Sequence, residues 1–383
     1  MTQRVRTITL TGLLVVTVVG MLTACDPGSE PSPTGTPAPS ASATPTEEPG
    51  PEFGVKPESR YNVGCGDLAA DGPLVSVHSA PIEPTDPFAT ALSSDPGIPT
   101  AAVVLQLGGI ACEWTNGAPM IENHQVSAAF VGTTINVIPD AATQWTKFTD
   151  TYGAGDSHLN CYSTGVVVNC DPNELIAGSW IEVTTYGVNA PIGGGADDYA
   201  AAIAPLLDGI RHAIERATIS PSTVVEGPFP IPADCDSLIT GDRFGDTLGI
   251  GPTISGKPHG GWSLASGARV LAGAGVCIFF YPDSELAAGI VRWLPNAAWA
   301  AEAAMDVATF PSAPLNAGLV GPEQSWYRCA PPNGQCTVDA TVNGNWIQDT
   351  VWDDDTGGLP TPADRRGSAV EVMRNILPNI IGT

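Results

Sequence analysis

The sequence predicts an α+β protein of two tandem duplicated modules, each an antiparallel sheet packed with helices on one face and stapled by two disulfides. Three observations support this fold class. Eight cysteines fall into two sets of four that repeat at a nearly constant spacing. Each half contains apolar runs of strand length and closes with a stretch whose apolar residues recur at helical spacing. The chain has 383 residues, 43% of them hydrophobic, so two modules can each bury a core.

The cysteine spacing indicates an internal duplication. Each cysteine of the second set lies 165 to 170 positions after its counterpart in the first. Trp180 lies ten positions after the last cysteine of the first set, and Trp346 lies ten after the last of the second. We expect both tryptophans to pack in a core, with a ligand-facing stacking role as the alternative. The two sets are Cys65, Cys112, Cys161 and Cys170, and Cys235, Cys277, Cys329 and Cys336.

The N-terminus has the features of an export signal. Arg4 and Arg6 precede an apolar stretch, Ile8 to Leu22, that is too short and too poorly flanked for a permanent membrane span. It ends in Leu-Thr-Ala-Cys25, which resembles the bacterial lipobox. The resemblance implies cleavage before Cys25 and acylation of its thiol, which would anchor the mature chain by lipid such as palmitate on the outer face of the cytoplasmic membrane.

The chain is expected to divide into five segments. Residues 1–24 form the signal peptide, and residues 25–60 form a Pro/Ser/Thr-rich tether that cannot bury enough apolar surface to fold. The modules occupy 61–218 and 233–383. The proline-rich stretch 219–232 between them is typical of a stiff linker.

The first part of each module is expected to contain a short helix and buried strands. The helix begins near the first cysteine of each set. The apolar runs Ala101–Cys112 and Ala268–Tyr281 are interpreted as buried strands. A further strand is expected at Gln125–Val137 in the first module.

The second part of each module is expected to begin with a helix capped by Asp140 or Asn296, whose short side chains suit an N-cap. A cysteine hairpin follows, and then a strand, clearest in the alternation of residues 181–186. An amphipathic helix closes each module, kinked or bounded by Pro205 or Pro378. In the first module its apolar stripe is Tyr199, Ile203, Leu206, Leu207, Ile210 and Ile214.

The eight repeated cysteines are expected to form structural disulfides, because disulfides persist in the oxidising compartment that an exported domain enters. Four cysteines allow three pairings in each half. We favour the hairpin pairs Cys161–Cys170 and Cys329–Cys336, which leaves Cys65–Cys112 and Cys235–Cys277. The absence of a Cys-x-x-Cys pair argues against a redox or metal centre.

Three short patterns resemble functional sites but are incomplete. Gly251–Lys257 matches the start of a phosphate-binding loop, yet Pro258 stands where Ser or Thr must hold magnesium. Asp353–Asp355 lacks the ligand spacing of a calcium loop. The five histidines show no metal-ligand spacing and are expected on the surface or in loops. We therefore predict no catalytic residue, no metal and no cofactor.

The charge balance limits the class of partner. The chain has 40 acidic and 15 basic side chains, a formal net charge of −25. Such a field repels phosphate backbones, which argues against nucleic acid. The expected partners are the membrane, through the lipid on Cys25, and an unidentified ligand or protein of the cell envelope.

Cys112-Glu113-Trp114, downstream of a Cys65-x-x-Leu68 helix, resembles the Cys-x-Trp element of uncharacterised actinobacterial lipoprotein domains, which are small α+β modules. The layout is also similar to the two-disulfide extracellular sensor domains of some actinobacterial kinases. The second half departs from the motif with Cys277-Ile278-Phe279. The resemblance implies binding or envelope-associated roles, so a non-catalytic pair of binding modules is the expected function. The alternatives are a secreted hydrolase with an unrecognised active site and a structural envelope spacer.

Overall fold

The computed structural model describes most of the chain from residue 54 to residue 381. Cys25, the signal peptide, residues 25–53 of the expected tether and Asp353–Asp355 lie outside the described residues, as do Lys257 and Pro258. Residues 50–383 belong to one compact unit. Within 54–381, the residues left undescribed are 70, 79, 89–96, 123–124, 223–230, 233, 257–261, 283, 308–312, 316–318, 320, 331–333, 353–361 and 363.

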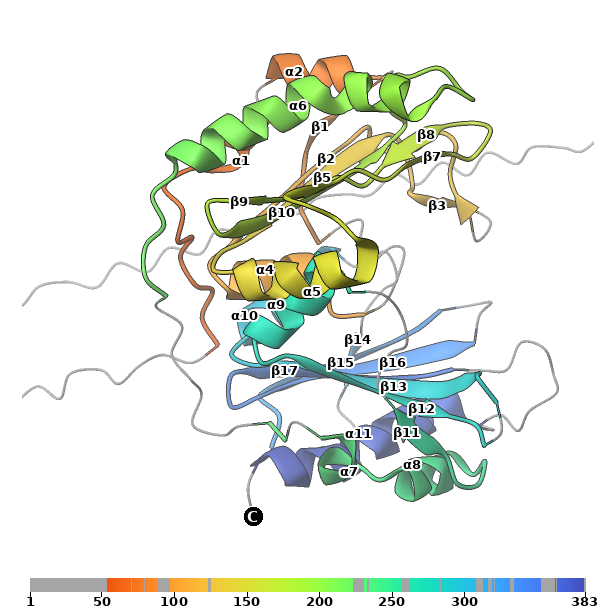
Figure 1. Ribbon diagram of the computed structural model, residues 1–383. Helices are drawn as coiled ribbons and strands as arrows, with labels where there is room; N and C mark the ends of the chain where they lie inside the picture. Colours follow the sequence, from red (N-terminus) through yellow and green to blue (C-terminus); the bar gives the residue numbers. More distant parts are fainter. Residues whose placement is uncertain are drawn as a thin grey trace, which may run out of the picture. The chain divides into compact units, whose positions relative to one another are not determined.

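The first half forms an antiparallel sheet whose outer face is covered by three helices, α1 (Cys65–Leu68), α2 (Asp71–Val77) and α6 (Ala196–Arg216) (Figure 1). Its inner face carries α4 (Thr100–Gln106) and α5 (Ala142–Tyr152). The strands in spatial order are β1 (Glu83–Thr85), β2 (Ile110–Thr115), β5 (Gly132–Ile138), β10 (Ser179–Tyr186), β8 (Val168–Cys170) and β7 (Cys161–Ser163), with β9 (Asn173–Ile176) beside β10 and β6 (Ser157–His158) beside β9. A separate two-stranded ribbon joins β3 (Ile121–Glu122) and β4 (Gln125–Val126).

The second half repeats this arrangement. Its outer helices are α7 (Cys235–Leu238), α8 (Gly241–Leu248) and α11 (Arg365–Ile381), and its inner helices are α9 (Leu264–Leu271) and α10 (Ala298–Val307). The strands in spatial order are β11 (Ile254–Gly256), β12 (Gly275–Phe280), β13 (Ala287–Leu294), β17 (Asn345–Val351), β16 (Gln335–Val342), β15 (Gln324–Ala330) and β14 (Ala313–Pro314). The matching strand orders confirm the α+β fold of two duplicated modules.

The helices lie on both faces of each sheet, so the expectation of helices on one face is wrong. The outer helices and the outer face of each sheet form one apolar core per half. The four inner helices instead form a third core that contains residues from both halves. Trp262 donates its indole N–H to the Gln144 carbonyl at 2.8 Å, and Trp299 donates to Oε1 of Gln106 at 2.9 Å. The two modules therefore share a core.

Two apolar runs interpreted as single strands are each a helix followed by a strand, so that prediction is wrong. Ala101–Cys112 contains α4 and the start of β2, and Ala268–Tyr281 contains the end of α9 and all of β12. α4 is almost entirely buried in the shared core, and the second run includes only the last four residues of α9, so little polar periodicity distinguishes either helix from a strand. Gly108 (φ +67°) and Gly273 (φ +65°) supply the left-handed turn between helix and strand.

Asp140 and Asn296 are not N-caps. Both adopt left-handed backbone conformations, with φ near +54°, and α5 and α10 begin at Ala142 and Ala298. Short polar residues tolerate this conformation, which explains the Asp and Asn in both copies. The expected strand Gln125–Val137 is also interrupted, since β4 ends at Val126 and β5 begins at Gly132.

Other expectations hold only in part. The stretch 181–186 lies in β10 and alternates as expected, and the six residues of the predicted apolar stripe are buried on α6. Pro205 and Pro378 bound neither helix, because α6 and α11 extend past them. Residues 54–60 belong to the folded unit rather than to an unfolded tether, since Gly54 accepts a backbone bond from Trp299 and Arg60 forms an ion pair with Asp140 at 2.7 Å.

The structure contains the four favoured disulfides. Cys65–Cys112 and Cys235–Cys277 join the first helix of each half to the second strand of its sheet, with Cα–Cα distances of 5.6 Å. The hairpin pairs Cys161–Cys170 and Cys329–Cys336 cross-link directly opposed strand residues. Since each half keeps both bonds in equivalent places, the disulfides belong to the common fold.

Candidate functional site

The inner face of the first sheet changes from apolar to polar along β10. Side chains alternate along a strand, so Trp180, Glu182, Thr184 and Tyr186 all face inward. Trp180 is completely buried in the shared core. The next three are half-buried and line a cavity of about 210 Å³. This cavity is the candidate functional site.

The strand register brings the polar residues of the cavity together in two rows. Glu113 on β2 lies opposite Thr134 on β5, which lies opposite Thr184 on β10. In the next row, Asn136 on β5 lies opposite Glu182 on β10. Two carboxyl groups, two hydroxyls and an amide therefore line one wall. Thr100, Ala101, Pro87, Met120 and the phenol of Tyr186 complete the lining, together with Cys112.

The pKa of Glu182 is unusually high for a carboxyl group. Burial, and to a smaller extent the negative charge of Asp171, raise its pKa to about 7. Burial also raises the pKa of Asp171, against a hydrogen bond with Thr184 that lowers it. The pKa of Tyr186 rises to about 12 through burial and the nearby acidic groups. Glu182 is therefore a carboxyl that gains or loses its proton near neutral pH.

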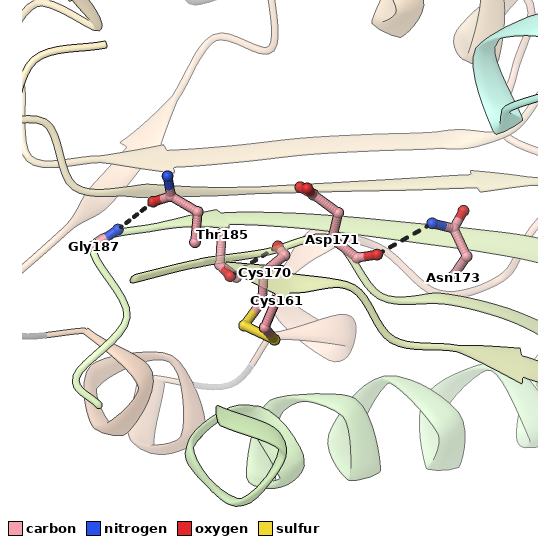
Figure 2. Close-up of a disulfide and its surroundings, with 7 residues drawn as sticks. Cys161, Cys170, Asp171, Asn173, Thr185 and Gly187 are labelled. Atoms are coloured by element: carbon pink, nitrogen blue, oxygen red, sulfur yellow. Dashed lines mark hydrogen bonds between the residues drawn. A yellow bond between two sulfur atoms is a disulfide. The ribbon is translucent and has the colours of Figure 1, made fainter. Parts of the chain in front are cut away.

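The Cys161–Cys170 hairpin places Asp171 near two residues that line the cavity, Thr184 and Glu182. Figure 2 shows the Asp171 side chain pointing away from the disulfide, which faces the outer helices. Asn173 donates to the Asp171 carbonyl at 3.3 Å, and Thr185 donates to the Cys170 carbonyl at 3.1 Å. These bonds fix the backbone on either side of Asp171, so its charge stays close to Glu182.

The second half carries a different set of residues at the matched positions. Arg292 and Gln348 are directly opposed on β13 and β17, where the first half has Asn136 and Glu182. Arg292 donates from Nη1 to Oε1 of Gln348 at 3.1 Å. The row of Glu113 and Thr134 is replaced by two isoleucines, Ile278 and Ile290. The carboxyl pair therefore occurs in one copy of the duplicated fold.

Trp180 and Trp346 are buried core residues, as the favoured interpretation has it. Both are 0% exposed. Trp180 donates its indole N–H to Asn173 at 2.9 Å, and Trp346 donates to Asp339 at 2.9 Å. The tryptophan and its acceptor seven positions earlier are thus a duplicated structural element.

The histidines were expected on the surface or in loops; His124 and His259 lie outside the described residues, and His78 lies between α2 and β1 but is not on the surface. His78 is only 4% exposed, and its Nε2 lies 2.6 Å from the Thr133 hydroxyl. Burial lowers its pKa, so the ring favours its neutral form. Within the described part of the chain, no group of three or more His, Cys, Asp or Glu side chains could hold a metal ion.

No sequence motif marks Glu113 and Glu182 as a site. Glu113 lies inside the Cys-x-Trp element, and Glu182 is one polar position of an alternating strand. The available signal was the difference between the copies. Glu113 aligns with Ile278, and Glu182 with Gln348, although the surrounding cysteines and tryptophans are the same.

Comparisons with known proteins assign no family. No protein-family model matches the chain, and no curated protein sequence matches it. One solved structure, the di-domain ARO/CYC StfQ from the steffimycin biosynthetic pathway, aligns at 8% identity over 78% of this chain and 95% of its own. The TM-score of 0.17 is too low to carry an argument about fold or function. None of the helices in the described ranges is long and apolar enough to cross a membrane.

Proposed function

We propose that this protein is a lipid-anchored binding protein of the cell envelope whose first module holds a small polar ligand in the cavity around Glu182. The observation that carries the proposal is the asymmetry between the copies. Both halves have the same sheet, helices and disulfides, yet the first alone has Glu113 and Glu182 at these positions. The fold therefore does not require these carboxyls.

The surroundings of Glu182 disfavour its charged form, and this free-energy cost supports a functional role. Removing a carboxyl from water disfavours its charged form, which is why its pKa rises. The second half has the neutral Gln348 at this position and bonds it to Arg292. A carboxyl with a perturbed pKa in a cavity is typical of a binding or catalytic site.

The size of the cavity suits a small ligand. Its volume of about 210 Å³ is below the roughly 300–1,000 Å³ typical of sites for drug-sized molecules. A metabolite of a few heavy atoms, or one end of a longer chain, would fit.

The four disulfides support an extracytoplasmic location. The lipobox supports anchoring through Cys25, with the folded unit beginning near Gly54. An extended proline-rich segment between these points would span on the order of 90 Å at about 3.1 Å per residue. The binding module would then be presented beyond the membrane surface.

The test is a ligand screen by thermal shift on the mature chain with Cys25→Ser, covering sugars, amino acids, amines and carboxylic acids. Thr184→Val removes a cavity hydroxyl, and Thr350→Val makes the same change at the matched position in the second half. A ligand whose stabilisation is lost in Thr184→Val and kept in Thr350→Val supports the proposal. Equal loss in both variants, or no stabilisation by any compound class, would contradict it.

A second candidate function, a hydrolase, is favoured by the same pair of carboxyls in one half. A glutamate with a pKa of about 7 has the acidity of a general acid at neutral pH. Glu113 lines the same cavity and could serve as the second carboxylate. Turnover of cell-wall or peptide substrates that is abolished by Glu182→Gln would establish this function in place of simple binding.

A further inference from the structure

We propose that the ligand of the first module carries a guanidinium group, which binds the Glu182 carboxyl beside Asn136 in the place that the Arg292 side chain takes in the second module. The inference rests on the proposed binding function and names the chemical class of its ligand. It is carried by the match between the two sheets, by the space in the cavity and by the hydrogen-bonding groups of its wall.

The second module contains the proposed contact within one chain. Arg292 on β13 lies directly opposite Gln348 on β17, and its Nη1 donates to Oε1 of Gln348 at 3.1 Å. Asn136 on β5 and Glu182 on β10 are opposed in the same way. In both modules this pair comes two residues after the buried tryptophan of the strand, so the two pairs occupy equivalent places. One pair has an arginine where the other has an asparagine.

The first module has space where the arginine would lie. Asn136 is shorter than Arg292, and the neighbouring Thr134 is smaller than its counterpart Ile290. Both smaller residues line the cavity of about 210 Å³, together with Glu182. The cavity is therefore found where the first module lacks the side-chain atoms of the second.

The wall of the cavity has acceptors for a guanidinium group. No residue that the structure describes forms a hydrogen bond or ion pair with the side chains of Glu182 and Asn136. A guanidinium has only donors, in a planar fork that can pair with both oxygens of a carboxylate. The Asn136 amide oxygen can accept a further N–H. The carbon chain of the ligand would pack against the apolar part of the lining, Pro87, Ala101 and Met120.

The charges around Glu182 favour a cation. None of the described residues that line the cavity is basic. Asp171 is the charged group that acts on the pKa of Glu182, and it raises that pKa. The other titratable groups of the lining and of the inner helices in contact with β10 are Glu113 and Tyr186, Lys147, Asp150 and Tyr152 on α5, and Arg269 on α9.

Binding of a guanidinium should be linked to release of a proton. With a pKa of about 7, Glu182 is mostly protonated at pH 5.5 and mostly ionised at pH 8. A guanidinium stays charged at both pH values. Because it pairs with the ionised carboxyl, affinity should rise about 30-fold from pH 5.5 to pH 8, in proportion to the ionised fraction.

The experiment is calorimetric titration of the mature chain carrying Cys25→Ser, at pH 5.5 and pH 8. The probes are propylguanidine, propylamine and propylurea. Propylurea has the shape of propylguanidine without its charge, and propylamine has the charge without the planar fork. N-acetylarginine amide is titrated as well, to distinguish an arginine side chain of a peptide from a free guanidine as the source of the group.

Three variants make the test specific. Asn136→Arg introduces the residue of the second module and should fill the cavity with a guanidinium of the chain itself. Glu182→Gln removes the charge and is expected to fold, because Gln348 occupies the same position in the second half. Glu215→Gln removes one charge from the exposed side of α6, which covers the opposite face of the sheet (Figure 1).

We expect propylguanidine to bind at pH 8 at least tenfold more tightly than propylurea and more tightly than propylamine. Its affinity should fall at least tenfold in Asn136→Arg and in Glu182→Gln, and should not change in Glu215→Gln. Without any ligand, Asn136→Arg should also lower the pKa of Glu182 in an NMR titration, because a guanidinium then lies beside the carboxyl.

Four results would overturn the inference: no binding of propylguanidine at pH 8, propylurea or propylamine binding as tightly as propylguanidine, unchanged affinity in Glu182→Gln, and unchanged affinity in a folded Asn136→Arg protein. A ligand of another class that is lost in Thr184→Val would overturn the guanidinium class while leaving the binding function standing. Failure of every compound class in the thermal-shift screen would instead reject the function itself.

Discussion

Replacing Asp349 by valine is expected to stabilise the protein. Asp349 lies on β17 between Val291 of β13 and Val338 of β16, and its side chain is 0% exposed. Neither carboxyl oxygen has a hydrogen-bond partner among the described residues. The matched position in the first half is Val183, which is buried in that half's core. The same fold therefore already accommodates valine here.

The expected gain in the free energy of unfolding has two sources: removal of an unpaired buried carboxyl group and burial of additional apolar side-chain atoms. A buried polar group without a partner costs about 1–3 kcal/mol. Burying a valine side chain contributes about 1.5–3 kcal/mol, reduced here because the aspartate carbon atoms are already buried. Together these give a gain of about 2–4 kcal/mol in the free energy of unfolding at acidic pH, where the carboxyl is neutral in both states.

The gain should increase with pH. Burial and the charge of Asp339 hold the pKa of Asp349 well above its ordinary value of 3.8. The folded protein therefore keeps a proton that the unfolded chain releases above about pH 4. Because stability falls with rising pH wherever the folded state binds more protons, wild type loses stability from this group above pH 4 and the valine variant does not.

The assay is urea denaturation followed by tryptophan fluorescence, with disulfides intact, at pH 4.5 and pH 7. Asp349→Asn serves as the matched control, because it removes the ionisation and keeps an unpaired polar group. It should flatten the pH dependence without the full gain of valine. An Asp349→Val protein less stable than wild type at both pH values would refute the reasoning, since it would show that the carboxyl makes a stabilising interaction.

Three further predictions concern the fold and the anchor. Replacing Cys161 and Cys170 by serine removes a bond that closes a loop of sequence separation 9, so unfolding free energy should fall by about 2–3 kcal/mol in urea denaturation. It should also lower the pKa of Glu182, measured by NMR titration, because the segment bearing Asp171 is released. Gly109→Ala places a Cβ 2.4 Å from a backbone oxygen of β5 and should cost about 1–3 kcal/mol, whereas Gly155→Ala meets open space and should change stability little. Cys25→Ala should move the protein from the membrane fraction to the medium and abolish labelling by a palmitate analogue.

The duplicated framework was predictable from the sequence because cysteines carry strong positional information. Their recurrence at one spacing predicted the two modules, and their proximity within each set predicted the hairpin pairs Cys161–Cys170 and Cys329–Cys336. The apolar stripe of α6 was also predictable from the sequence, because one side of that helix faces solvent. These signals are local or repeat within the chain.

The shared core was not predictable for a physical reason. The inner helices α4 and α9 pack against each other, and α4 has few solvent-exposed positions that would reveal a helical period. A run without polar residues fits a buried strand as well as a buried helix. The contact between modules depends on residues that are far apart in sequence, such as Trp299 and Gln106.

The candidate site could not be predicted from the sequence because its residues come from three strands. Glu113, Thr134 and Thr184 become neighbours only once the register of β2, β5 and β10 is fixed. Alternation predicted that Glu182 and Thr184 share a face, but not that this part of the face lines a cavity. Comparing the two halves position by position would have singled out Glu113 and Glu182, because the framework around them is unchanged.

The central claim, that the first module binds a ligand and the second does not, is tested most directly by NMR. Backbone amide shifts of the mature chain carrying Cys25→Ser would be followed during titration with the compound that stabilises the chain most in the thermal-shift screen. The proposal predicts saturable shifts at Asn136, Thr184 and Glu182, with Arg292 and Gln348, which match Asn136 and Glu182, unmoved. Shifts centred on Arg292 and Gln348, or equal shifts in both halves, would contradict it.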